Sequence, residues 1–87
     1  MRLLNIGFGS YVSPERIVSA VDPESNPIKR VVTQARESGK LIDATFGRKT
    51  KTVLIMDSNH VILCPLAPET VAQRVAGKTG GAADEEE

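Results

Sequence analysis

The chain has 87 residues, with one Cys, one His and a formal net charge of zero. This length predicts one domain, and the Cys and His counts exclude an internal disulfide or a zinc site built only from these ligands. No segment approaches the roughly 20 apolar residues that cross a bilayer, and the first residues lack the apolar stretch of a secretory signal. We therefore expect a cytoplasmic protein with no membrane partner.

The charges are unevenly distributed along the chain. Four of the eleven acids stand at residues 84–87, so residues 1–83 carry a net charge of +4. A segment rich in Gly and small residues precedes this acidic end, which is typical of a flexible tail. We expect an ordered domain over residues 1–76 and a flexible acidic tail over residues 77–87.

The first part of the chain reads as short strands. Two are expected over residues 2–8 and 11–12, with a bend at the glycines between them. A turn with Pro at its second position then leads into a β-branched strand over residues 17–21. A helix capped by Ser13, with Pro14 in its first turn, remains open as an alternative for this segment.

One main helix is expected to begin near Pro27. Ser25 or Asn26 can cap it, and Gly39 is suited to end it. Apolar residues follow at the helical spacing that marks one buried side: Ile28, Val31, Val32 and Ala35. The cations on the other side are interspersed with acid, so we interpret them as a solvated surface.

Three more strands are expected over residues 41–46, 52–56 and 60–64, followed by a short helix that Pro68 opens. The connection at residues 46–53 reads as the turn of a β-hairpin. The predicted order is β-β-β-α-β-β-β-α. The fold class is therefore α+β, with a small antiparallel β-sheet, one main helix and a short C-terminal helix.

Two of these strands, at residues 53–56 and 61–64, are apolar at every position. Both faces of each strand should therefore be dry, whereas the main helix covers only one face. We expect a second subunit to cover the other, which predicts a homo-oligomer. The alternative is that the last helix and the N-terminal strand suffice.

A cationic loop is the strongest candidate site. Arg48, Lys49 and Lys51 lie close together with the hydroxyl of Thr50, and no acid occurs between residues 44 and 56. Such a loop is either simply solvated or binds phosphate. One loop that neutralises two or three phosphates binds weakly. Each phosphate contributes only about −0.9 to the slope of log affinity against log salt concentration. Repetition in an oligomer would make the binding firm.

The remaining candidates are weaker. Arg16 is a second possible phosphate ligand, and its alternative is a surface cation paired with an acid. Gly77-Lys78-Thr79 lacks the first Gly of a phosphate-binding P-loop, and Asp57, Ser58 and His60 are too close in sequence to form a triad. We expect no enzyme activity, no cofactor, no metal and no small-molecule substrate.

Several motifs occur in a fixed order: NIGFG at residues 5–9, PIKR at 27–30, LIDAT at 41–45, GR at 47–48 and PETVAQR at 68–74. Together they closely resemble the bacterial extracellular matrix regulator RemA family, over about residues 3–75. The resemblance implies a DNA-binding transcriptional activator of biofilm-matrix genes, associated with the nucleoid. It also implies a closed ring that bends or wraps double-stranded DNA with basic loops from many subunits.

The family's implicated arginines fall on Arg16, Arg48 and Lys49. Where the family loop reads Arg-Arg-Thr-Arg, this chain has Arg48-Lys49-Thr50-Lys51. Positive charge is kept while the forked guanidinium donor is lost, which favours phosphate contact over guanine readout. A rival hypothesis is a protein-interaction scaffold whose basic loops bind an acidic partner or RNA, although the few aromatics disfavour RNA.

Overall fold

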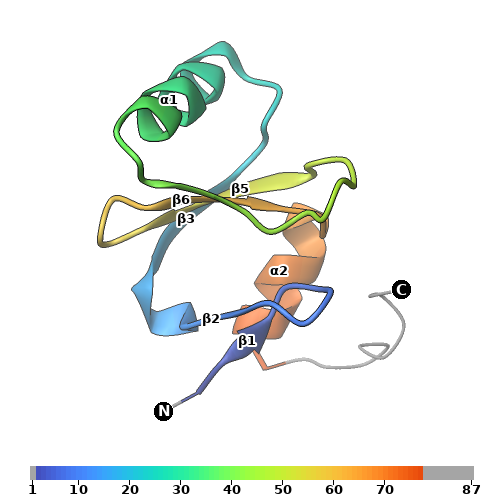
Figure 1. Cartoon of the computed structure of the whole chain (residues 1–87). Helices are drawn as coiled ribbons and strands as arrows, with labels where there is room; N and C mark the ends of the chain where they lie inside the picture. Colours follow the sequence, from blue (N-terminus) through green and yellow to red (C-terminus); the bar gives the residue numbers. More distant parts are fainter. Residues whose placement is uncertain (1, 78–87) are drawn as a thin grey trace.

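The structure, a computed structural model, describes residues 2–77. Their elements, in chain order, are β1 (Leu4–Asn5), β2 (Tyr11–Val12), the short 3-10 helix η1 (Pro14–Arg16), β3 (Ile17–Val21), α1 (Asn26–Glu37), β4 (Leu41–Asp43), β5 (Thr52–Met56), β6 (Val61–Cys64) and α2 (Pro68–Val75). This order confirms the predicted one (Figure 1). The alternative helix near Ser13 is reduced to the single turn of η1. The predicted flexible tail, apart from Gly77, lies outside the described residues.

The main sheet is mixed, with strand order β3-β5-β6-β4. β5 is antiparallel to β3 and β6, whereas β4 runs parallel to β6. The prediction of an antiparallel sheet is therefore wrong for β4, and so is the predicted hairpin between β4 and β5. The apolar strands β5 and β6 take the two central positions, and the more exposed β4 lies at one edge.

α1 covers one face of this sheet (Figure 1). The Ser25 hydroxyl accepts a hydrogen bond from the backbone N–H of Ile28 at 3.3 Å, and Pro27 lies in the first turn. Gly39 follows the helix with a φ of +76°, which suits a residue without a side chain. The predicted apolar side is confirmed, since it packs with buried or half-buried residues of the strands: Val21, Leu41, Val53, Val61 and Leu63.

α2 and the β1–β2 pair lie on the opposite side of the sheet (Figure 1). There Ile6, Leu54, Cys64 and Val71 belong to one core cluster, and each has at most 1% of its surface exposed. Segments of this chain thus keep both faces of β5 and β6 dry. The last helix and the N-terminal strand cover this face, as the alternative expected, and the homo-oligomer stays a prediction.

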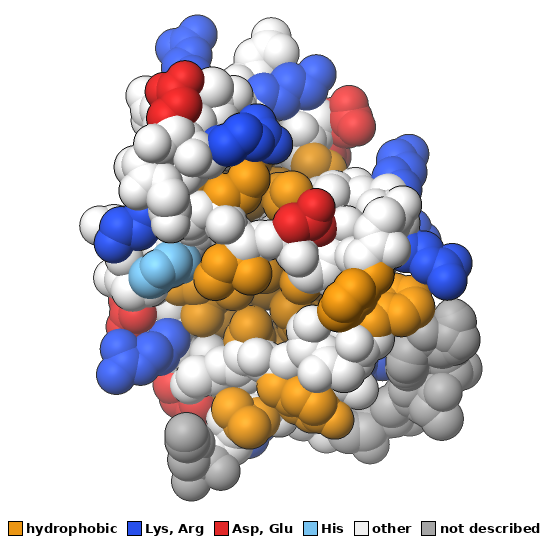
Figure 2. All heavy atoms as spheres, viewed as in Figure 1, with side chains coloured by type: hydrophobic (Ala, Val, Ile, Leu, Met, Phe, Trp, Pro, Cys, Tyr) orange, Lys and Arg blue, Asp and Glu red, His pale blue; other side chains and the backbone are white. Residues whose placement is uncertain are grey.

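Large apolar side chains nevertheless remain exposed in the single chain. Val18 lies on the edge strand β3 and Ile42 on the edge strand β4, and the others are Leu3, Tyr11, Phe46 and Val75. Figure 2 shows hydrophobic side chains gathered across the middle of one face, with Lys and Arg side chains around them. Within residues 2–77 no helix is both long and apolar enough to span a membrane.

Candidate nucleic-acid interface

The cationic loop crosses one end of the sheet. It leaves the edge strand β4, passes the end of β6 and enters β5, where the backbone N–H of Lys51 donates to the carbonyl of Cys64 at 2.9 Å. Arg48, Lys49 and Lys51 are exposed, and Thr50 is half-buried. The structure thus presents the predicted cations to solvent, on a crossover connection instead of a hairpin tip.

Side-chain hydrogen bonds hold both ends of this loop. At its start, Asp43 Oδ1 accepts hydrogen bonds from the backbone N–H of Thr45 at 2.9 Å and from its hydroxyl at 2.6 Å. These bonds lower the pKa of the Asp43 carboxyl, the hydroxyl bond most, so it is ionised near neutral pH. At its end, the buried Thr52 hydroxyl donates to the carbonyl of Leu66 at 2.7 Å. The cations therefore stand on a loop with two fixed ends.

The ring of Phe8, in the β1–β2 turn, packs against Arg48 and Phe46 of the loop. The guanidinium carbon of Arg48 lies 5.0 Å from the ring centroid of Phe8, within cation–π range. The rings of Phe8 and Phe46 meet edge to face, with centroids 5.9 Å apart. Phe8 was not among the residues predicted for the site. The sequence feature that could have pointed to Phe8 is the Phe-Gly dipeptide, which occurs at both Phe8 and Phe46.

An acidic turn also approaches the loop in space. Asp22 and Glu24 line a hollow of about 180 Å³ together with Lys49, Thr50 and Lys51. The absence of acids among the loop's sequence neighbours therefore does not extend to its spatial neighbours. These two carboxylates reduce the positive potential on one side of the loop.

Arg16 lies at the other end of the sheet. Ile17 pairs with Met56 at the end of β5, whereas the loop leads into Thr52 at its beginning. At about 3.3 Å per strand residue, Arg16 is roughly 15–20 Å from the loop. Arg16 and the loop are therefore well separated within one subunit.

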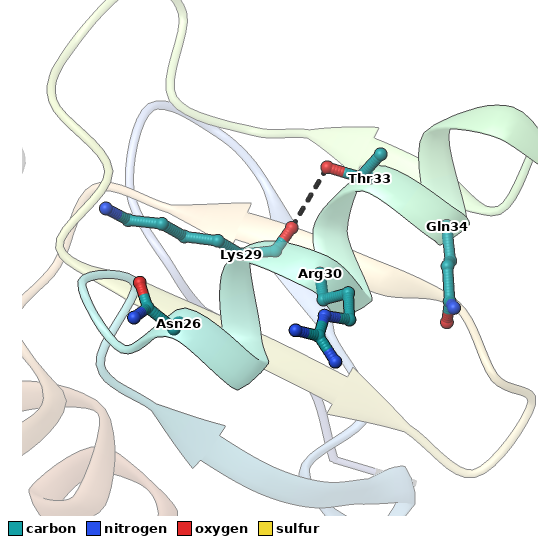
Figure 3. A pocket seen from close by; sticks show the side chains of 5 residues that line it. All are labelled: Asn26, Lys29, Arg30, Thr33 and Gln34. Atoms are coloured by element: carbon teal, nitrogen blue, oxygen red, sulfur yellow. Dashed lines mark hydrogen bonds between the residues drawn. The ribbon is translucent and has the colours of Figure 1, made fainter.

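The outer side of α1 carries a second cationic surface (Figure 3). Lys29 and Arg30 line a hollow of about 380 Å³ with Asn26, Thr33 and Gln34. The Thr33 hydroxyl donates to the Lys29 carbonyl within the helix at 3.0 Å, as the dashed line shows. The polar side chains point out from the helix, as the interpretation of a solvated surface requires.

The residues that superficially suggest catalysis do not form a triad. Ser58 Oγ lies 2.7 Å from His60 Nδ1, but the Asp57 carboxylate is engaged by Arg16 on the other side. Cys64 is the core thiol expected from its apolar surroundings, and burial raises its pKa. No group of three or more potential metal ligands occurs among residues 2–77.

The fold and loop define a small α+β protein with a fixed cationic loop at one end of a mixed sheet. The family of extracellular matrix regulatory protein A-like (RemA-like) proteins matches residues 3–75. The chain is 55% identical over 85 residues to a Desulforamulus reducens protein, covering 98% of this chain and 94% of that one. It is 60% identical over 74 residues to a Cyanothece protein, covering 85% and 81%. Both carry the name "Putative regulatory protein". The chain belongs to the RemA-like family, which confirms the resemblance.

Proposed function

We propose that the protein is a non-enzymatic, DNA-binding transcriptional regulator. The observation that carries this proposal is the cationic loop: Arg48, Lys49 and Lys51 are exposed on a segment whose two ends are fixed by hydrogen bonds. Fixed cations with a hydroxyl donor beside them suit the phosphates of double-stranded DNA. The family and the names of the relatives support regulation. We further propose that the protein acts at the nucleoid in the cytoplasm, where it activates the transcription of biofilm-matrix genes.

Binding strength argues for a homo-oligomer. Three cations on one loop give a weak and strongly salt-dependent site, whereas several loops on one duplex act at a high effective concentration. Among residues 2–77 no further strand pairs with the outer edges of β3 and β4, and their exposed side chains Val18 and Ile42 suit subunit contacts. A closed ring of such subunits would bend or wrap DNA, with sequence preference set by DNA deformability.

Arg16 takes part in this proposal through a different part of the assembly. Because it lies at the other end of the sheet from the loop, Arg16 would contact the duplex at a separate point from the loop cations of the same copy. The proposed DNA contacts are thus Arg48, Lys49, Thr50 and Lys51 from each loop, with Arg16 added where subunits meet.

A matched pair of double variants tests the loop. Arg48→Ala with Lys49→Ala removes two cations from it, and Lys29→Ala with Arg30→Ala removes the same charge from the outer side of α1. Titrating a fluorescent duplex at several salt concentrations, we expect the loop variant to lose affinity by about a hundredfold, with a flatter salt slope. The α1 variant should lose less than about tenfold.

The other outcomes separate the alternatives. Equal losses in both variants would mean that overall charge, and not the loop, binds DNA. Unchanged binding by the loop variant, with the oligomer intact by light scattering, would favour the scaffold hypothesis with an acidic partner or RNA. A wild-type protein with the mass of one subunit at micromolar concentration would remove the ring from the proposal.

A further inference from the structure

Two turns with the same dipeptide lie side by side at the cationic loop. In one, the N–H of Ser10 donates to the carbonyl of Gly7 at 3.0 Å; in the other, the N–H of Arg48 donates to the carbonyl of Thr45 at 3.0 Å. The central residues are Phe8 and Gly9 (φ +53° and +81°) in the first turn and Phe46 and Gly47 (φ +53° and +83°) in the second. Positive φ at both central positions is the pattern of a type I′ turn.

The first central position of such a turn is an unusual place for phenylalanine. Asn, Asp and Gly favour it, because a bulky side chain in left-handed backbone crowds the following carbonyl. Phe46 occupies it with 65% of its surface exposed, so burial in this chain does not explain the ring. Unfavourable backbone geometry with so little burial is the kind of outlier that concentrates at functional sites.

The neighbouring groups set the direction of the Phe46 ring. Phe8 is half-buried and supports both Phe46, edge to face, and the Arg48 guanidinium, at 5.0 Å. The exposed Phe46 ring and the exposed Arg48 guanidinium therefore both pack against Phe8. Within residues 2–77, the Arg48 side chain has no hydrogen bond or ion pair to another residue, so its donors remain available to a ligand.

We infer that Phe46 is an apolar DNA contact that inserts beside the phosphates held by the loop, wedging against a base step and bending the duplex. This inference rests on the proposed DNA-binding function and deepens it. Apolar side chains that enter the minor groove next to cationic ones unstack base steps and kink DNA in this way. One duplex offers both kinds of partner: a phosphate for Arg48, and sugar and base surface for Phe46.

A second copy of this chain is a less suitable partner than DNA for Phe46 and Arg48 together. A subunit contact centred on Phe46 would also bury the guanidinium of Arg48, and burying a charge without a partner is costly. Lys49 and Lys51 follow on the same loop and would be brought close to that contact. Charge complementarity therefore favours the nucleic acid over an apolar protein surface.

Phe46→Asn is the test variant, since Asn tolerates left-handed backbone and removes the ring. Phe46→Leu keeps apolar bulk, and Leu3→Thr is a matched control because Leu3 is 57% exposed just before β1, outside the loop and both edge strands. The probe is a mixed-sequence duplex with 2-aminopurine at TpA steps, which unstack easily, and with dyes at both ends. The readouts are affinity, 2-aminopurine fluorescence, end-to-end energy transfer, thermal unfolding and mass by light scattering.

We expect Phe46→Asn to keep the unfolding midpoint, the mass and the salt slope of wild type. It should lose affinity by about tenfold at fixed salt, in the range that stacking on one aromatic side chain supplies, together with the 2-aminopurine and bending signals. Phe46→Leu should retain part of both signals, and Leu3→Thr should retain both in full.

Three results would overturn the inference. If wild type binds and bends the duplex and Phe46→Asn does the same, the wedge is wrong while the proposed function stands. If Phe46→Asn changes the mass of the oligomer, the ring belongs to a subunit contact. If wild type binds no duplex, the proposed function and the wedge fail together.

Discussion

Arg16 Nη1 lies 3.2 Å from Asp57 Oδ2, across the adjoining ends of β3 and β5. Both side chains are largely in solvent, with 68% and 45% of their surfaces exposed. An exposed pair of this kind adds no more than about 1 kcal/mol to stability. Its larger consequence concerns binding, because the Asp57 carboxylate occupies the place that a DNA phosphate would take on Arg16.

Asp57→Asn should therefore raise DNA affinity by a few-fold, through Arg16. The same substitution made on Arg16→Ala should have little effect, since the competing cation is already absent. A double-mutant cycle on duplex affinity measures this coupling. Equal gains in the two backgrounds would mean that Asp57 acts only through overall charge, and Arg16 would then have no role as a DNA contact.

Glu24→Gln should also strengthen DNA binding. Glu24 shares a hollow with Lys49 and Lys51, so its charge opposes the approach of a phosphate. Asp22 is left unchanged, because its carboxylate accepts a hydrogen bond from the backbone N–H of Glu24 at 2.8 Å and shapes the turn. The gain should fade as salt rises, since screening acts within about 10 Å at 0.1 M.

The control for this variant is Glu37→Gln, which removes the same charge from the far end of α1. We expect it to leave the affinity within about twofold of wild type, given its distance from the loop and the screening length. If Glu37→Gln strengthens binding as much as Glu24→Gln, the effect belongs to net charge and the hollow beside the loop has no special part in it.

The order of the elements was predictable because its signals are local. Ser25 and Pro27 mark the start of α1, and Pro68 marks the start of α2. The position of β4 was not predictable in this way. Apolar strands indicate that they are buried but not which neighbours they pair with, and a loop that follows a strand can close a hairpin or cross over another strand.

In the candidate site, too, some features could be predicted from the sequence and others depend on how the chain packs. The loop cations were identified from charge alone, and the structure exposes them. Phe8 and Glu24 reach the loop from segments remote in sequence, so only the packing of the chain reveals them. The sequence does not show where Arg16 lies relative to the loop, and the antiparallel register of β3 and β5 puts it at the opposite end of the sheet.

The lowered pKa of Asp43 predicts that the free energy of unfolding decreases in acid. Its pKa is lowered chiefly by the Thr45 hydroxyl and then by the Thr45 backbone N–H, with a smaller contribution from Arg36. A carboxyl whose pKa is lower in the folded state stabilises the fold fully above its unfolded pKa of about 3.9. This stabilisation is lost as pH falls through the folded pKa, because the protonated carboxyl is a poorer acceptor.

Urea unfolding of wild type and Asp43→Asn across pH measures this effect. We expect wild type to be the more stable near neutral pH, and the difference to shrink as the pH falls below the unfolded carboxyl pKa of about 3.9 and on through the lower folded pKa. Asp22→Asn provides a comparison on another turn acid. A difference between wild type and Asp43→Asn that does not change with pH would contradict the assigned role of the carboxylate.

Thr52, where the loop enters β5, allows a test of how much a buried hydrogen bond adds to stability. Its side chain is fully buried, and its hydroxyl donates to the Leu66 carbonyl at 2.7 Å. Thr52→Val preserves shape but leaves that carbonyl without its donor, which should cost about 1–3 kcal/mol in the free energy of unfolding. Thr33→Val is the matched control, because the Thr33 hydroxyl bonds a helix carbonyl on an exposed surface. It should cost about 0.5 kcal/mol or less. Denaturant titration of the two variants decides the matter: equal and small losses would show that the Thr52 hydroxyl does not anchor the loop.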